Sequence, residues 1–332
     1  MLATTTPVVR DPNDGAAMRA DLEHGVCTVV QVLTPEEAIM FREKVVRVMT
    51  QVRASGQTPH GAKGCGFVGC YGAAQQEDVW VLRLNERLRT AMETIYGTPD
   101  LAVSCDNVFY WGADGGREST PRTQRATSPR KLVQQRLGST LCLHKDKGLT
   151  SYGARFEQGL RASNELAYHR SLQAQITLTP VTATSAGLVL VDGPMDFTDD
   201  EQAVLFTGLD GDFCCCTDEA YDRFKDRLVK VCVPAGCAII WRSDRVHANC
   251  KADRDCDPRR VGLFVTWHPR AHAYDRDKKM AFVMEGRTGC HWPLILTRWT
   301  RSSSHMSNRH GESKPLTPHF SEELRAKIWH AV

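Results

Sequence analysis

The sequence lacks the features that would place the protein in a membrane or in a secretory route. No apolar run approaches the ~18 residues that are needed to cross a bilayer. Residues 1–18 carry Arg10, Asp11 and Asp14, and they contain no apolar segment of the kind found in secretory signals. We therefore expect an intracellular protein, cytoplasmic or nuclear, that does not act on membranes.

Zinc ribbons and zinc fingers are also disfavoured, because none of the thirteen cysteines are spaced as Cys-x-x-Cys. In a reducing compartment these cysteines are most simply free thiols. The triplet Cys214-Cys215-Cys216 has two interpretations. We favour a buried strand of small apolar side chains, and a metal or redox cluster is the alternative.

Charge of one sign is not in excess. Lys and Arg number 42 against 39 Asp and Glu, which leaves a formal net charge of +3, too small to indicate nucleic acid by itself. With 42% hydrophobic residues over 332 positions, the composition is that of an ordinary globular protein. We expect a main domain over 19–290 with an insertion at 112–136, an N-terminal extension (1–18) and a C-terminal extension (291–332).

Two helices are indicated by their ends. The run Thr34-Pro35-Glu36-Glu37 supplies an N-cap threonine, a proline at the first helical position and a glutamate at the third. A second helix over 84–95 is expected to stop at Gly97. Shorter helices are expected over 218–228 and 321–329.

From residue 101 onward the pattern favours short strands separated by Gly, Pro and Asp. The expected strands are 101–111, 140–144, 172–179, 188–191, 229–233, 238–241 and 261–267. Many short strands of this kind predict a mainly β fold, a sandwich or a barrel, with flanking helices.

A histidine and an aspartate lie two positions apart near the end of the 140–144 strand. Residues i and i+2 of a strand project from the same face, so His144 and Asp146 can bind one ion together. Among the twelve histidines only His144 is followed by Asp two residues later. His247, which follows the apolar strand 238–241, is the candidate third ligand. Two histidines and one carboxylate on one face of an octahedron are typical of non-haem iron(II) oxygenases.

An arginine opens the strand that follows His247. Arg260 lies thirteen residues after it, and a guanidinium can hold the distal carboxylate of a dicarboxylic co-substrate with two hydrogen bonds. Arg259 is adjacent, so the choice between the two arginines stays open, with Arg260 preferred. Gln173, Gln175 and Thr177 are expected to face the interior, either as co-substrate contacts or as plain interior polar residues.

The residues just described also carry a family resemblance. The opening Gly25-Val26-Cys27-Thr28-Val29-Val30 with Leu33-Thr34-Pro35-Glu36-Glu37, the segment 173–193 and the run His247-Ala248-Asn249 resemble the phytanoyl-CoA dioxygenase-like family of iron(II)/2-oxoglutarate oxygenases. The likeness is patchy over residues 19–270. It implies a double-stranded β-helix (jelly-roll) core. It also implies that His144, Asp146 and His247 bind Fe(II), that 2-oxoglutarate and O2 are consumed, and that succinate and carbon dioxide leave as a substrate is hydroxylated.

Two other functions compete with this interpretation. A zinc hydrolase could use the same triad, but it needs a base beside a metal-bound water and no such residue stands out. A nucleic-acid-binding module without catalysis would depend on the basic segments. The insertion 112–136 carries Arg117, Arg122, Arg125, Arg130, Lys131 and Arg136. It is interpreted either as a lid that recruits an anionic substrate or as a solvated loop without regular structure.

Overall fold

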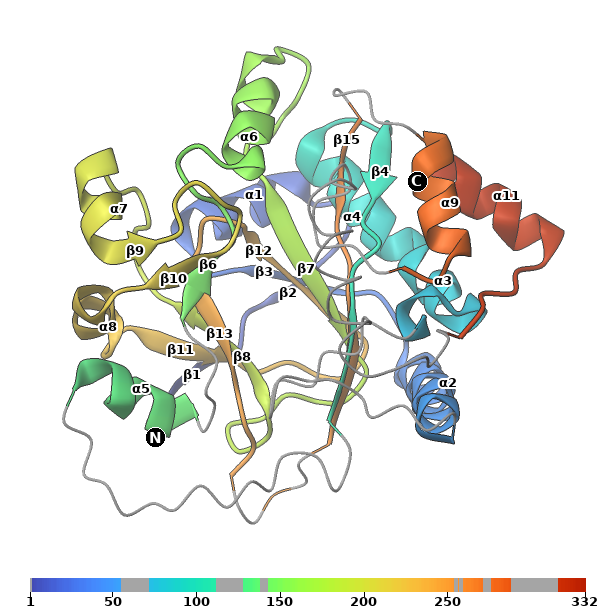
Figure 1. Ribbon diagram of the computed structural model, residues 1–332, viewed down its shortest axis with the longest axis horizontal. Coiled ribbons are helices and arrows are strands. Elements are labelled where there is room, and N and C mark those ends of the chain that lie inside the picture. Colours follow the sequence, from blue (N-terminus) through green and yellow to red (C-terminus); the bar gives the residue numbers. More distant parts are fainter. Residues whose placement is uncertain are drawn as a thin grey trace.

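The computed structural model describes residues 2–54, 72–111, 128–137, 143–253, 256, 259–270, 276–287 and 316–332. Two large β-sheets dominate these residues, and helices lie around them (Figure 1). None of the helices in these ranges combines the length and apolar character that crossing a bilayer requires.

The first large sheet, sheet A, holds the strand order β1-β11-β8-β13-β6-β10-β9. The bounds are β1 Ala3–Thr5, β6 His144–Lys145, β8 Gly187–Val191, β9 Phe206–Thr207, β10 Cys214–Cys216, β11 Leu228–Val231 and β13 His247–Cys250. Its strands pair antiparallel, except that β1 joins β11 in parallel. The N-terminal residues therefore extend this sheet.

The second large sheet, sheet B, holds the order β2-β3-β12-β7-β14-β5. The bounds are β2 Val9–Arg10, β3 Thr28–Gln31, β5 Val108–Trp111, β7 Leu172–Thr177, β12 Cys237–Arg242 and β14 Arg260–Phe264. A small third sheet pairs β4 (Leu101–Val103) with β15 (Trp267–Pro269).

The chain passes back and forth between the two large sheets. Strands β5, β7, β12 and β14 lie in sheet B, and β6, β8, β11 and β13, which come between or beside them in the sequence, lie in sheet A. Apolar side chains from both sheets form one buried cluster that includes Val29, Leu190, Ile239 and Trp241. Two sheets packed through such a cluster leave their outer faces for helices.

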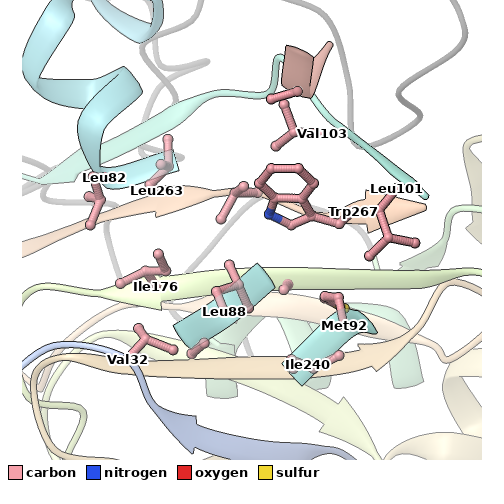
Figure 2. Close-up of a cluster of buried hydrophobic side chains, with 14 of the residues drawn as sticks. Val32, Leu82, Leu88, Met92, Leu101, Val103, Ile176, Ile240, Leu263 and Trp267 are labelled. Carbon is pink, nitrogen blue, oxygen red and sulfur yellow. The ribbon is translucent and has the colours of Figure 1, made fainter. Parts of the chain in front are cut away.

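The outer face of sheet B carries the largest buried cluster of the molecule (Figure 2). Trp267 lies at its centre, with Leu88 and Met92 on one side and Val103 and Leu263 nearby. The helices that supply this layer are α1 Gly15–His24, α2 Pro35–Ala54, α3 Glu77–Arg83, α4 Glu86–Tyr96, α9 Arg276–Met284 and α11 Glu322–Ala331, and α6 (Tyr152–Ala162) adds Phe156 and Leu160. A short 3-10 turn, η1 Ala73–Gln75, precedes α3.

A second, smaller cluster covers the outer face of sheet A. It joins Val189, Val191 and Ala248 of the sheet to side chains such as Tyr221 and Phe224. The helices on this side are α5 Pro129–Leu137, α7 Asp199–Leu205 and α8 Asp218–Phe224. Helix α6, Tyr152–Ala162, follows β6 and stands at one end of the sheets (Figure 1).

Several expectations from the sequence are confirmed by this fold. The Thr34 capping box forms, since the Thr34 amide donates to Glu37 and the Glu37 amide donates to Thr34 Oγ1. Gly97 ends α4 with φ of 74°. The cysteine triplet is strand β10, with Cys214 and Cys216 buried, and every cysteine in the described ranges is a free thiol.

Other local expectations are wrong. Residues 129–136 of the insertion are helical and not irregular, because Pro129 takes the first helical position behind Ser128, whose carbonyl accepts the first helical hydrogen bond. The single strand expected over 101–111 divides into β4 and β5. The rest of the insertion and most of the C-terminal tail lie outside the described residues.

Gly262 in the middle of β14 is required for the close packing of sheet B. A Cβ at this position would lie 2.1 Å from Cζ of Phe109 and 2.3 Å from the Ile176 carbonyl oxygen. We expect Gly262→Ala to lower the free energy of unfolding by about 1–3 kcal/mol in urea titrations. Gly211→Ala, whose Cβ would meet nothing closer than 3.5 Å, is the matched control. Equal stability of both variants would contradict this account of the packing.

Candidate metal centre

Three potential metal ligands come together where β6 meets β13. His144 is directly opposite His247 in the antiparallel pairing, and Asp146 follows β6 by one residue. One ligand atom from each residue lies within 4.8 Å of the others. Asp146 Oδ2 is 3.4 Å from His247 Nε2, and Asp146 Oδ1 is 3.9 Å from His144 Nε2. Asp146 and His247 are buried, and His144 is partly buried.

The ring of His247 is held in one orientation by the chain just before it. Its Nδ1 lies 2.9 Å from the carbonyl oxygen of Arg245. Because a carbonyl oxygen only accepts hydrogen bonds, Nδ1 must carry the proton, and the lone pair is left on Nε2, which faces Asp146. The Arg245 side chain is itself anchored to the carbonyl oxygens of Val191 and Gly25, at 2.8 and 2.9 Å. The β12–β13 turn thus prepares His247 to bind a metal ion.

Asp146 is held from two sides. Its amide donates to the carbonyl oxygen of Ser243 in the same turn, at 3.0 Å. Its carboxylate oxygen Oδ2 accepts a hydrogen bond of 2.9 Å from Gln173 Nε2 on β7. The carboxylate therefore has a fixed direction, and it connects sheet A to sheet B at this point.

His144 lies on the more open side of the cluster. Its ring centroid is 4.2 Å from that of His247 and 4.5 Å from that of Phe213, whose side chain is 46% exposed. Phe213 lies just before β10, in the hairpin that β9 and β10 form. A substrate that approaches the three ligands from this side would meet the Phe213 ring.

This donor set suits a divalent transition metal. Two imidazole nitrogens and one carboxylate oxygen form the facial set that leaves coordination positions open on an octahedral ion such as Fe(II). The proton on His247 Nδ1 and the hydrogen bond to Asp146 are the outer contacts that metal-binding histidines and carboxylates usually have. The residues thus fit a metal ion.

Arg260 lies in the same interior, at the start of β14. Its Nη1 donates to Asn249 Oδ1 at 2.6 Å, its Nη2 donates to Gln175 Oε1 at 3.0 Å, and its guanidinium lies over the Phe109 ring. Asn249 is two residues beyond His247 on β13, and Gln175 is two residues beyond Gln173 on β7. Two residues of a strand span roughly 6–7 Å. The guanidinium therefore lies one strand repeat, that is two residues, along the strands from the three ligands.

The guanidinium keeps its positive charge despite its position. Arg260 is only 3% exposed, and burial lowers its pKa to about 10. That value is still well above neutral pH, so the interior holds a cation at the end opposite the Asp146 carboxylate. An anionic group of a bound molecule is the natural partner for such a cation.

Gln173 and Thr177, the other two polar residues predicted to face the interior on β7, have different surroundings. Gln173 contacts Asp146, as described. The Thr177 hydroxyl instead lies 3.3 Å from the carbonyl oxygens of both Pro234 and Cys237, beyond the level of Arg260. A co-substrate role for either residue stays a prediction.

Some site residues were missed by the sequence reasoning. Asn249 and Phe213 acquire their roles through contacts between strands, which no local pattern predicts. Arg245 acts through its backbone carbonyl, and a backbone role has no sequence signal. Alternation along β7 predicted that Gln175 faces the interior, and alternation along β13 could have indicated Asn249, because it lies two residues from His247.

Comparison with known proteins gives structural likeness only. No family model and no curated protein sequence matches the chain. GlcNAc Inducible Gene 2 of Candida albicans superposes with a TM-score of 0.53 at 10% identity, covering 97% of this chain and 81% of its own. A hypothetical protein from Escherichia coli gives 0.50 at 12% identity, covering 99% and 86%. At these identities the likeness extends to the fold alone.

A third solved structure is the non-heme alpha-ketoglutarate-dependent epimerase SnoN from nogalamycin biosynthesis. It is 13% identical, with 87% of this chain and 95% of that chain covered, and its TM-score is 0.48. We draw no conclusion for this chain from so distant a match. The specific resemblance to the phytanoyl-CoA dioxygenase-like family finds no support among these matches and stays a proposal.

The metal cluster is tested by direct binding measurements. Loss of an outer contact commonly weakens metal affinity 10–100-fold, so removal of a ligand is expected to cost about a hundredfold or more. His144→Ala, Asp146→Ala and His247→Ala should each show this loss for Co2+ by calorimetry, with circular dichroism unchanged. His319→Ala, at an exposed histidine, is the control. Wild-type affinity in all three ligand variants would exclude this cluster as the metal site.

Proposed function

We propose that the protein is an iron(II)- and 2-oxoglutarate-dependent dioxygenase that hydroxylates a substrate and releases succinate and carbon dioxide. The observation that carries the proposal is the arrangement of His144, Asp146 and His247 around one point, with the buried cation of Arg260 one strand repeat away. A five-carbon dicarboxylate can bridge that separation.

Each group in the interior then has a definite task. His144, Asp146 and His247 would hold the iron, and Arg260 would bind the distal carboxylate of 2-oxoglutarate. When bound, the iron supplies the activation of O2 and of the keto acid. Gln173 keeps the Asp146 carboxylate oriented, and Asn249 and Gln175 keep the guanidinium of Arg260 from turning away. The buried apolar surroundings exclude water from this space.

The proposal includes a double-stranded β-helix (jelly-roll) fold. A double-stranded β-helix consists of strands that alternate between two facing sheets, and the alternation of β5 to β8 and β12 to β14 between sheets B and A supports it. In that description both histidines lie on the sheet formed by β6, β13, β8 and β11. Membership in the phytanoyl-CoA dioxygenase-like family is part of the same proposal.

The two competing functions lack a comparable observation. A zinc hydrolase needs a base that faces the open side of the metal, and among the described neighbours of the cluster Gln173, Phe213 and Trp241 cannot serve as one. A nucleic-acid-binding module without catalysis would not account for the clustering of His144, Asp146 and His247. An anionic substrate, nucleic acid included, fits the basic insertion, and a steep decrease of substrate binding with rising salt would support it.

The reaction is tested by succinate formation. The purified protein, supplied with Fe(II), 2-oxoglutarate and O2, should release succinate slowly without added substrate, and the Asp146→Ala variant should not. Zinc in place of iron should give none. Succinate formation equal in wild type and Asp146→Ala would contradict the proposal.

The co-substrate site is tested at the two adjacent arginines. A desolvated charge pair is worth about 2–5 kcal/mol, so Arg260→Ala should weaken 2-oxoglutarate binding roughly 30-fold or more. Binding of Co2+ should not change. Arg259 is exposed, and Arg259→Ala is the matched control. If Arg259→Ala causes the loss and Arg260→Ala does not, the assignment must move by one residue.

A further inference from the structure

A cavity lies beside β6, next to the β12–β13 turn and α7. Its volume is about 340 Å3. Four cations, two carboxylates, one amide and two apolar side chains line it: Lys145, Lys147, Arg161, Arg170, Asp196, Asp244, Gln202, Met195 and Phe197. None of the three candidate metal ligands is among them. Cations outnumber carboxylates in the lining, so the cavity favours an anion.

Lys145 is the central feature of this cavity. It lies between His144 and Asp146 in the sequence, and strand alternation turns its side chain to the opposite face of β6. The residue is 3% exposed. Its ammonium donates to Gln202 Oε1 and lies 4.5 Å from the centroid of the Phe206 ring. Both partners are neutral, and no carboxylate of the described residues lies within 4 Å of this nitrogen.

The other cations of the lining are already paired. Lys147 contacts Glu157 and lies 3.6 Å from Asp244. Arg161 pairs with Glu157 at 3.4 Å, and Arg170 pairs with Asp196 and Asp244 at 3.3 and 3.6 Å.

The two carboxylates of the lining are neutralised in the same way. Arg242, which lies behind the cavity wall, binds Asp244 at 2.7 Å and Asp196 at 3.3 Å. The acids therefore offer little repulsion to an incoming anion, and the ammonium of Lys145 is left without a direct counter-charge.

A buried ammonium without a carboxylate is costly to maintain, because desolvation is not offset by an ion pair. We propose that this cavity is a binding site for a small anion that carries a phosphate or a carboxylate group on an apolar moiety. The anionic group contacts Lys145, and Lys147 and Arg161 add positive potential at its sides. Met195 and Phe197 form the wall against which the apolar part lies. The site is separate from the metal cluster, and it stands whether or not the proposed oxygenase reaction is correct.

The test uses metal-free full-length protein, so that the metal cluster does not contribute. Phenyl phosphate and phenylacetate, titrated separately by calorimetry, show which anionic group the cavity prefers. Saturable binding of at least one probe is expected in wild type. Lys145→Met keeps most of the length of the side chain and removes its charge, and it should weaken that binding by at least about tenfold. Lys327→Met, at an exposed lysine of α11, makes the same change in net charge and should not.

A second variant keeps the test meaningful if Lys145→Met folds poorly. Gln202→Glu places a carboxylate next to the ammonium, so the protein supplies its own anion and the probe should again bind at least about tenfold more weakly. Thermal unfolding checks that each variant is folded. Absence of saturable binding in wild type, or wild-type affinity in both Lys145→Met and Gln202→Glu, would overturn the proposal.

Discussion

The pairing of β6 with β13 is the interaction on which the rest of the site depends. His144 and His247 are directly opposite each other only in this register, and Asp146 reaches both rings from the end of β6. A slip of one residue would turn the histidines to the outer face of sheet A. Ala248, which follows His247, packs among apolar side chains of that outer face, so burial on both faces of β13 holds the register.

In the polar interior, amide side chains hold charged side chains at two successive positions along the strands. Gln173 of β7 donates to the carboxylate of Asp146. Two residues further on, Gln175 of β7 and Asn249 of β13 accept hydrogen bonds from the guanidinium of Arg260. These hydrogen bonds fix the direction of the side chains that make them. A carboxylate and a cation are thereby presented one strand repeat apart, facing the same space between the sheets.

Local features of the fold could be predicted where the signal is contained in a few consecutive residues. The Thr34–Glu37 capping box and the Gly97 stop are of this kind, and so is the spacing of His144 and Asp146. The prediction failed at residues 129–136, where a loop without regular structure was expected although Pro129 suits the first position of a helix. Gln175 could be predicted to face the interior, but its partner Arg260 could not, and Asn249 and Lys145 could not be assigned roles, because each acts through a partner far away in the sequence.

The central claim is that iron and 2-oxoglutarate bind together between His144, Asp146, His247 and Arg260. The most direct measurement is the visible absorption spectrum of the Fe(II) protein, recorded without O2, as 2-oxoglutarate is added. A keto acid that chelates Fe(II) produces a charge-transfer band, and the account predicts that this band grows to saturation in wild type. It should be absent in His247→Ala. A wild-type spectrum that stays unchanged, or a band that survives in His247→Ala, would contradict the account.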